Sequence, residues 1–253
     1  MAAMMERGVL VVEKACNAQI CSQCLQELIE NRGQLLSLPA TMAEMNRDDA
    51  GQRCFLPFAV TKGKRAGEPP QHRRDFELRI DGHSVGAVLR SILSGHAGDC
   101  LAEALGGDDC QLCGLTAISC ETGTAAQPIH ADAEYSLDSA RVITIFLAMH
   151  DVCEEAAGPT RFCPGTHSPA CFPPEHVWLP PTPARVEERG GTQWFPLRAG
   201  DAVLMEATTW HGGGANTSGQ WRTILSISFV ASSESSVLDD GKWRLADFRA
   251  PLV

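Results

Sequence analysis

The spacing of hydrophobic residues changes along the chain, and the change divides it into two parts. In the first part, apolar runs alternate with patterns of helical period, and Asn17 stands where it would cap a helix. Gly95 and Gly98 interrupt a later helical pattern and predict a break there. The pattern predicts a buried strand at 8–12, helices at 18–29, 85–93 and 100–105, and short strands at 54–60 and 76–80.

From residue 111 onward, short apolar stretches are separated by glycine and proline, which is typical of a β-sandwich or barrel. The predicted strands are 115–120, 141–149, 160–163, 202–207 and 223–230. We therefore predict a mainly β fold with flanking α-helices. A helix-rich part (about 1–110) forms a layer against a β core (about 111–231), and a tail (232–253) follows. No repeat or linker divides the sequence, so we expect a single domain, 1–253.

Composition and charge narrow the classes of function. With 44% hydrophobic residues among 253, the chain can bury a sizeable core. The formal net charge of −10 repels phosphate groups, which argues against nucleic acid and against an anionic membrane as partners. The sequence has neither an apolar run of about 18 residues nor a signal peptide. We therefore expect an intracellular, cytoplasmic protein.

The eleven cysteines fit buried free thiols better than a disulfide framework. Two Cys-x-x-Cys pairs, Cys21/Cys24 and Cys110/Cys113, could together hold zinc or carry out redox chemistry. Neither pair is flanked by the glycine-rich knuckles of zinc ribbons. Core packing is therefore the preferred interpretation, and a thiol-based zinc or redox protein is the alternative.

A histidine and a carboxylate stand two residues apart in "QPIHAD", residues 127–132. In extended backbone His130 and Asp132 project from the same face and can converge on one point, although such a pair alone is often only a polar strand end. Further along, His211 ends an apolar run, a glycine-rich stretch follows, and Arg222 opens an otherwise uncharged strand. We expect a β-hairpin that brings His211 and Arg222 to the same end of a sheet.

Together these residues predict a metal site with His130, Asp132 and His211 as ligands. Two imidazoles and one carboxylate form the triad that is diagnostic of non-haem Fe(II) oxygenases. This triad leaves coordination positions open for a co-substrate and dioxygen. A fixed guanidinium such as that of Arg222 offers a planar two-point grip on a carboxylate.

Other polar residues are given structural roles. His167 in "PGTH" is expected in a turn, and the neighbours His150 and Asp151 are expected to point to opposite faces of a strand. Trp210 should face away from the site because it precedes His211. The proline-rich segment 172–191 is either a lid or a surface loop. A basic segment is expected to be a solvated loop rather than an anion-steering patch; it contains Lys62, Lys64, Arg65, Arg73 and Arg74.

The order of these motifs resembles the phytanoyl-CoA dioxygenase family of Fe(II)/2-oxoglutarate-dependent dioxygenases. The resemblance is strongest from residue 115 to 230, and the second histidine is followed by an arginine eleven residues later. The motifs that carry it are "GVLVVEKACNAQIC" (8–21), "GTAAQPIHAD" (123–132), "AGPTRFCPGTHSP" (157–169) and "LRAGDAVLMEATTWHGGGANTSGQWR" (197–222).

This resemblance implies a double-stranded β-helix (jelly roll, cupin-like) core with the iron at its open end. His130, Asp132 and His211 would bind Fe(II), and Arg222 would bind the distal carboxylate of 2-oxoglutarate. The implied reaction uses O2 to convert 2-oxoglutarate to succinate and CO2 while it hydroxylates a small or medium organic molecule.

Several positions refine the resemblance. Halogenating relatives carry a small residue where Asp132 stands, so halogenation is disfavoured. Gly213 replaces a serine that contacts the co-substrate in some members. Phe146 resembles an aromatic residue beside 2-oxoglutarate, and Thr144 on the same strand face is a candidate hydroxyl donor to it. Gln127 either contacts the co-substrate or satisfies a backbone group.

Two alternatives stand beside this hypothesis. A prolyl-hydroxylase-like protein modifier shares His-x-Asp and the second histidine, but typically uses lysine where Arg222 stands. A catalytically silent or zinc-holding jelly roll shares the fold. The sequence names neither the substrate nor the oligomeric state.

Overall fold

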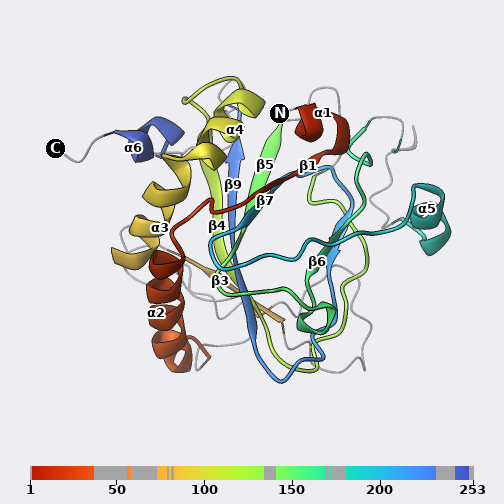
Figure 1. Ribbon diagram of the computed structural model, residues 1–253, viewed down its shortest axis with the longest axis horizontal. Helices are drawn as coiled ribbons and strands as arrows, with labels where there is room; N and C mark the ends of the chain where they lie inside the picture. The colour runs from red at the N-terminus through yellow and green to blue at the C-terminus, as the bar shows by residue number, and fades with distance from the viewer. Residues whose placement is uncertain are drawn as a thin grey trace.

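The computed structural model (Figure 1) describes residues 2–36, 56–57, 73–78, 80, 83–133, 141–168, 171, 181–231 and 243–250. Its helices are α1 (Ala2–Arg7), α2 (Ala18–Leu36), α3 (His83–Leu93), α4 (His96–Leu105), the 3-10 helix η2 (Glu155–Ala157), α5 (Pro183–Glu188) and α6 (Leu245–Arg249). Its strands are β1 (Val9–Val12), β2 (Leu56–Pro57), β3 (Arg73–Glu77), β4 (Gln111–Cys120), β5 (Val142–Ala148), β6 (Thr160–Phe162), β7 (Ala202–Glu206), β8 (His211–Gly213) and β9 (Arg222–Val230).

Seven strands form one antiparallel sheet in the order β1-β7-β5-β9-β4-β3-β2, and β6 and β8 form a second sheet. Helices α2, α3, α4 and α6 cover one face of the large sheet, while β6 lies on its other side (Figure 1). The predicted mainly β fold with flanking helices is therefore confirmed. None of the helices in the described ranges is long and apolar enough to cross a membrane.

The two faces of the large sheet bury different side chains because successive residues of a strand point to opposite sides. On the face covered by helices, called the helix face, Leu225, Ile227 and Phe229 of β9 are fully buried in the main hydrophobic cluster together with helix residues. On the other face, called the pocket face, a smaller apolar cluster includes Phe146 and Ile224. The helix face is thus the principal core.

The second sheet lies opposite the pocket face and is extended by isolated backbone bridges. His130 bridges to His211, and Phe162 bridges to Gln193. The pairing order His130, β8, β6, Gln193 thus gives a four-segment layer of which only β6 and β8 are full strands. This layer carries two of the predicted metal ligands.

Most predicted elements are present with shifted ends. Asn17 caps α2 as expected, because its side-chain oxygen accepts a hydrogen bond from the backbone N–H of Gln19 at 2.8 Å. The predicted break at Gly98 is wrong, since Gly98 lies inside α4. A Cβ there would come within 1.8 Å of the Leu93 carbonyl oxygen, so this glycine permits a close approach of two helices.

The predicted hairpin of His211 and Arg222 is also wrong. β8 pairs with β6 in the small sheet, whereas β9 pairs with β4 and β5 in the large one. The glycine-rich connection therefore crosses from one sheet to the other. The Asn216 side chain donates to the carbonyls of Cys120 (2.9 Å) and Gln220 (2.8 Å) and holds this crossing in place. Turn residues do not reveal whether the flanking strands pair with each other.

Part of the predicted tail is docked on the helix layer. Leu245 and Phe248 of α6 are buried in the main cluster. Arg249 forms ion pairs with Asp99 (2.6 Å) and Asp108 (2.7 Å). The division into parts 1–110, 111–231 and 232–253 stays a prediction, although β1, β2 and β3 from the first part join the large sheet.

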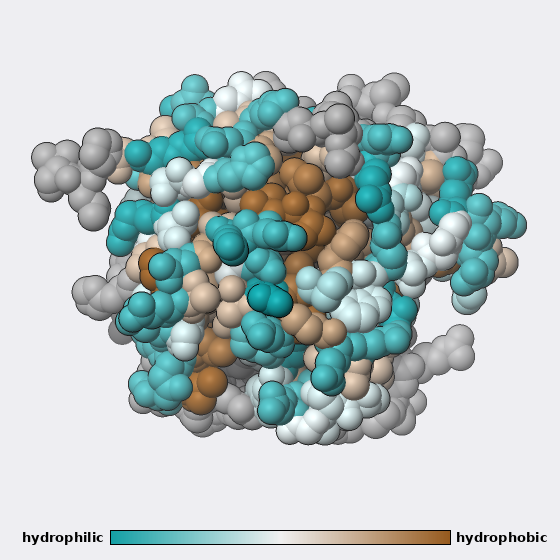
Figure 2. Space-filling model, viewed as in Figure 1, coloured by the Kyte–Doolittle hydropathy of each residue, from teal (hydrophilic) through white to brown (hydrophobic). Residues whose placement is uncertain are grey.

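The outer surface in Figure 2 is mostly hydrophilic, with an apolar area at its centre where β1 and β7 run in Figure 1. Residues 62–72 and 172–180 lie outside the described residues, so the choice between a lid and a surface loop for segment 172–191 and the solvated loop expected for residues 62–72 are not tested. The predicted strands at 54–60 and 76–80 are described only in part. β2 covers Leu56–Pro57, and β3 lies three residues earlier than expected.

Candidate active site

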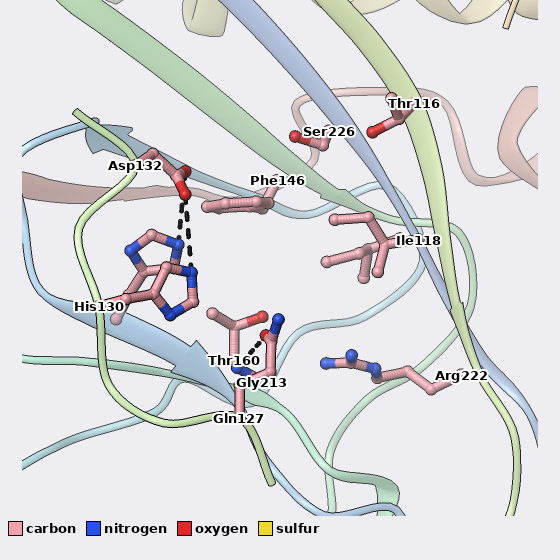
Figure 3. Close-up of a pocket in the computed structure, with 12 residues that line it drawn as sticks. Thr116, Ile118, Gln127, His130, Asp132, Phe146, Thr160, Gly213, Arg222 and Ser226 are labelled. Carbon is pink, nitrogen blue, oxygen red and sulfur yellow. Dashed lines mark hydrogen bonds and ion pairs between the residues drawn. The ribbon is translucent and has the colours of Figure 1, made fainter. Parts of the chain in front are cut away.

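The predicted ligands come from two segments that the fold brings together, residues 130–132 and β8. His130 is held by backbone hydrogen bonds in both directions with His211, at 2.8 and 2.7 Å, so the two imidazoles lie side by side with ring centroids 4.6 Å apart. The backbone N–H of Asp132 donates to the Ala207 carbonyl at 2.8 Å, which fixes the carboxylate above both rings. Figure 3 shows the His130 and Asp132 side chains pointing toward one another.

The distances within this triad fit a metal ion. Oδ1 of Asp132 lies 3.6 Å from Nε2 of His130, and Oδ2 lies 3.5 Å from Nε2 of His211. One ligand atom from each residue lies within 4.8 Å of the other two, and this is the one such group of three or more His, Cys, Asp or Glu residues within the described ranges. A single ion can therefore be reached by all three.

The protonation of the imidazoles also favours a cation. Nδ1 of His130 is 2.8 Å from the Pro128 carbonyl, and Nδ1 of His211 is 3.0 Å from the Thr209 carbonyl. Because a carbonyl oxygen only accepts, both Nδ1 atoms carry the proton, which is the usual second interaction of a metal-binding histidine. With Nδ1 as the hydrogen-bond donor, Nε2 of each ring is the atom that faces the carboxylate and can bind a metal. The Nε2 atoms and the carboxylate oxygens are then all electron-pair donors, and a cation between them would relieve their mutual repulsion.

Burial and the nearby His211 hold the pKa of His130 below its ordinary value. Burial disfavours the charged imidazolium, and a second imidazole disfavours it further. His130 therefore stays neutral to lower pH than a solvated histidine, and its Nε2 stays available for a metal.

Arg222 lies across the pocket from the triad (Figure 3) and is only 2% exposed. Its Nη2 donates to Sγ of Cys120 at 2.8 Å, but Nε and Nη1 have no hydrogen-bond partner among the described residues. A buried guanidinium with two unmet donors is costly unless an anion binds it. Arg222 is therefore a buried cation suited to binding an anion, and it does not reach out to water.

The triad and Arg222 line one cavity of about 150 Å³. This is several times the roughly 30 Å³ that one water occupies, so a small organic acid fits. Phe146, Ile118 and Ile224 form its apolar wall. The other lining residues are Thr116, Gln127, Thr160, Gly213 and Ser226.

The family model described as phytanoyl-CoA dioxygenase (PhyH) matches residues 4–224. The chain belongs to the phytanoyl-CoA dioxygenase family. Family membership, together with a His-Asp-His cluster that fits an iron ion, confirms the predicted dioxygenase class with iron and 2-oxoglutarate as its cofactors. No curated protein is similar enough in sequence to count as a relative.

Solved structures share the fold of this family member at low sequence identity. The non-heme alpha ketoglutarate dependent epimerase SnoN from nogalamycin biosynthesis has a TM-score of 0.63 and 19% identity, covering 95% of this chain and 87% of that one. The carbocyclase SnoK from the same biosynthesis has a TM-score of 0.60 and 16% identity, covering 91% and 82%. EvdO2 from Micromonospora carbonacea var. aurantiaca, complexed with 2-oxoglutarate, has a TM-score of 0.56 and 17% identity, covering 91% and 89%.

Of the three further residues predicted to contact the co-substrate, two line the pocket and one does not. Gln127 lines the pocket, and its side-chain oxygen accepts from the Gly213 backbone N–H at 2.8 Å, which turns its amide nitrogen into the pocket (Figure 3). Phe146 lines the pocket 5.9 Å from the His211 ring. Thr144 is not among the lining residues, and its hydroxyl lies 2.9 Å from that of Ser228. Their roles toward a co-substrate stay predictions.

Arg73 was missed as a site residue. It was expected in a solvated loop, which is wrong, since it is 2% exposed at the start of β3. Its Nε donates to Sγ of Cys120 at 3.1 Å, so this thiol lies between two guanidiniums, Arg73 and Arg222. A Cβ at Gly213 would lie 2.5 Å from an Arg73 nitrogen, so Arg73 fills the space that a serine there would need. In the sequence, the glycine at position 213 was the one sign that another side chain occupies the place of that serine.

The competing interpretations find no support in the described residues. Nε2 of His150 accepts from the Thr223 backbone, and Asp151 accepts from Ala199, so both are used within the fold. Trp210 faces away from the pocket as expected, in a cluster with Cys163. The ten described cysteines are free, and none belongs to a metal-binding group. The four-thiolate zinc alternative is therefore wrong for the two Cys-x-x-Cys pairs.

Proposed function

We propose that this chain is a dioxygenase that couples conversion of 2-oxoglutarate to succinate and CO2 with hydroxylation of a small or medium organic molecule. One observation carries the proposal: the His130, Asp132 and His211 triad and the unpartnered, buried donors of Arg222 face each other across one cavity. The cavity therefore has a cation site at the triad and an anion site at Arg222. An oxo-dicarboxylate needs this arrangement, because one end binds the metal while the other end binds the guanidinium.

We further infer that the β core is a jelly roll. The strand order β7-β5-β9-β4 in the large sheet faces the order Gln193, β6, β8, His130 in the small layer. From β4 onward the chain passes back and forth between the two layers, and β6 and the Gln193 segment are the one successive pair within a layer, which is how a double-stranded β-helix is wound. Under this inference the two ligand histidines belong to one layer, and Arg222 belongs to the other.

In the proposed site, His130, Asp132 and His211 would hold Fe(II) on one side and leave the other side open. When bound, the iron with 2-oxoglutarate and O2 supplies the oxidising chemistry that breaks a substrate C–H bond. Arg222 would bind the distal carboxylate of 2-oxoglutarate through its free Nε and Nη1 donors. Arg73 and Arg222 together give this end of the pocket a positive charge, of which the Cys120 thiol neutralises part when ionised.

The apolar wall of the pocket orients the co-substrate and excludes water. Phe146 packs against the His211 ring, and Ile118 and Ile224 stand opposite each other on paired strands. An apolar wall between the anion end and the metal end lowers the local dielectric and strengthens both charge interactions. Water that would compete for the open iron positions is thereby displaced.

Hydroxylation is the reaction we propose by default. SnoN is an epimerase and SnoK a carbocyclase, and both have this fold, so fold alone does not select the outcome. The intact triad and the open donors of Arg222 argue against a silent binding module. We propose a small-molecule partner and no nucleic acid or membrane partner, in keeping with the net charge of −10. We also propose an intracellular location, in keeping with the free cysteines.

Anaerobic addition of Fe(II) and 2-oxoglutarate tests the proposal. The wild-type protein should develop a weak visible charge-transfer band, and His130→Ala should not. His96→Ala, at an exposed position of α4, is the matched control and should behave like the wild type. If 2-oxoglutarate does not bind under these conditions, the proposed function is wrong. If it binds but no succinate forms with any metabolite tested, the silent module is favoured instead.

A further inference from the structure

The pocket face carries a group of hydroxyls beyond the apolar wall, seen from Arg222. Thr116 of β4 and Ser226 of β9 are directly opposite each other in the register and both line the pocket. Ser228 follows two residues later on the same face, opposite Thr144 of β5, and their hydroxyl oxygens are 2.9 Å apart. We call Thr116, Ser226 and Ser228 the hydroxyl patch.

The polar side chains of this patch are not needed for packing of the β core. Interior positions of a closed or layered β core are normally apolar, and on the helix face of these strands the two buried hydroxyls, of Ser119 and Thr223, hydrogen bond to each other. Thr116, Ser226 and Ser228 are only partly buried although they point between the two sheets, so the space in front of them is open. Neither Thr116 nor Ser226 has a side-chain hydrogen bond to another described residue.

The patch lies too far from Arg222 to serve the same ligand group. Ser226 is four residues beyond Arg222 along β9, which is about 13 Å of strand. In Figure 3 the Thr116 and Ser226 hydroxyls point into the pocket on the side of Asp132, away from Arg222. A co-substrate held between Arg222 and the triad therefore leaves the hydroxyl patch free for the second substrate.

The charge of the pocket limits what that substrate can be. Arg222 is the sole lysine or arginine among the described residues that line it, and it stands at the other end. The patch itself offers neutral groups that both donate and accept hydrogen bonds. It therefore suits a neutral oxygen-rich molecule and offers no cation for a phosphate or a coenzyme A thioester.

We propose that the hydroxyl patch is the substrate-recognition subsite and that the substrate is a neutral, polyhydroxylated molecule of the cyclitol or glycoside class. This inference rests on the proposed function. An apolar acyl chain in the same place would displace water and leave the hydroxyls unpaired. Sites that hydrogen bond a substrate hydroxyl reject the analogue that lacks it by about 10⁴-fold, so the patch discriminates strongly.

Two substitutions on the pocket face and one on the helix face test the inference. Thr116→Val and Ser226→Ala remove a hydroxyl at nearly constant shape. Thr223→Val removes a hydroxyl from the opposite face of β9, where it contacts Ser119 at 2.7 Å away from the pocket. It is the matched control for loss of a hydroxyl from this strand.

The enzyme with Fe(II) and 2-oxoglutarate is assayed for O2 uptake and succinate with inositols and methyl glycosides, and with fatty acids and acyl-CoA thioesters. A hydroxylated compound should stimulate turnover, and Thr116→Val and Ser226→Ala should raise its KM by about 10-fold, as expected for one lost hydrogen bond. Their affinity for 2-oxoglutarate should be unchanged, and Thr223→Val should match the wild type.

Stimulation by the acyl compounds alone would overturn the inference. So would normal binding of 2-oxoglutarate without stimulation by any hydroxylated compound, and an unchanged KM in both pocket-face variants. In these cases the proposed dioxygenase function is untouched, because co-substrate binding is measured in the same samples. Loss of 2-oxoglutarate binding in the wild type would instead remove the proposed function, and the inference with it.

Discussion

The two faces of the large sheet use the same strands for different purposes. Along β9, Leu225, Ile227 and Phe229 point to the helix face and are fully buried among apolar side chains. The alternate positions, Arg222 and Ser226 among them, point to the pocket face and meet a cavity. One strand thus carries a complete core on one side and an incomplete one on the other.

The comparison shows that the helix face provides most of the stability, whereas the pocket face carries the candidate chemistry. Helices close the helix face and remove its side chains from water, which is the main source of folding free energy. The pocket face is left with unmet hydrogen-bond donors and open space, which cost stability but can bind ligands. Substitutions on the pocket face should therefore change ligand binding more than the free energy of unfolding, and substitutions on the helix face should do the reverse.

The largest effect on the pocket side is expected for Asp132→Ala. Loss of the carboxylate removes one of three proposed ligands, so iron affinity should fall by more than the roughly 10 to 100-fold that substitution of a supporting residue costs. Succinate formation should fall with it, while the free energy of unfolding of the metal-free protein changes little. Metal content after dialysis and urea denaturation measure the two effects. Asp151→Ala, whose carboxylate accepts from the Ala199 backbone instead, should keep its iron.

The helix face should show the reverse profile in Ile227→Ala. Ile227 is fully buried, so the cavity should lower the free energy of unfolding by about 2 to 5 kcal/mol. Affinity for 2-oxoglutarate should stay within a factor of about 2, since the side chain points away from the pocket. The adjacent Ser226→Ala should change stability by less than about 0.5 kcal/mol. Equal stability losses in both variants would contradict the separation of the faces.

Arg222→Met should stabilise the protein and disable it. The substitution removes a buried guanidinium with two unmet donors, so we expect a gain of about 1 kcal/mol or more in the free energy of unfolding. Loss of the charged hydrogen bonds to the co-substrate should weaken 2-oxoglutarate binding by about 1.5 to 3 kcal/mol or more. Arg222→Lys should recover part of the affinity, since lysine keeps the charge but not the planar fork. Calorimetric titration and urea denaturation give both quantities.

The smallest effect concerns pH and Cys120. Burial alone raises the pKa of this thiol, but Arg222 and Arg73 outweigh it and bring the pKa below its ordinary value. As pH rises through this lowered pKa, the thiolate pairs with the guanidiniums and competes with the incoming carboxylate. Affinity for 2-oxoglutarate should therefore fall with rising pH, by about 3 to 10-fold.

Cys120→Ser is the matched variant for this effect, because serine keeps a hydrogen-bonding group that does not ionise in the same range. Its affinity for 2-oxoglutarate should vary less with pH than that of the wild type. A pH dependence identical in both proteins would show that Cys120 does not set the charge of the anion end.

Much of the fold could be read from local patterns. The strand of residues 223–230 and the helix of residues 85–93 were predicted within two residues, because alternation and helical period are properties of a short stretch of chain. The pairing of β8 and β9 was predicted wrongly, because a turn signal is equally compatible with a hairpin and with a crossing between sheets.

By itself the sequence determined most of the longer helices and strands, and it placed His130 and Asp132 on one face two residues apart. Only the tertiary structure decided that Arg73 is buried beside Cys120, 47 residues away, and that Thr116 faces Ser226. Register between distant strands is set by how whole faces pack, not by neighbours along the chain. The ligand set was therefore visible in spacing, whereas the charge and polarity of the pocket around it came from long-range packing.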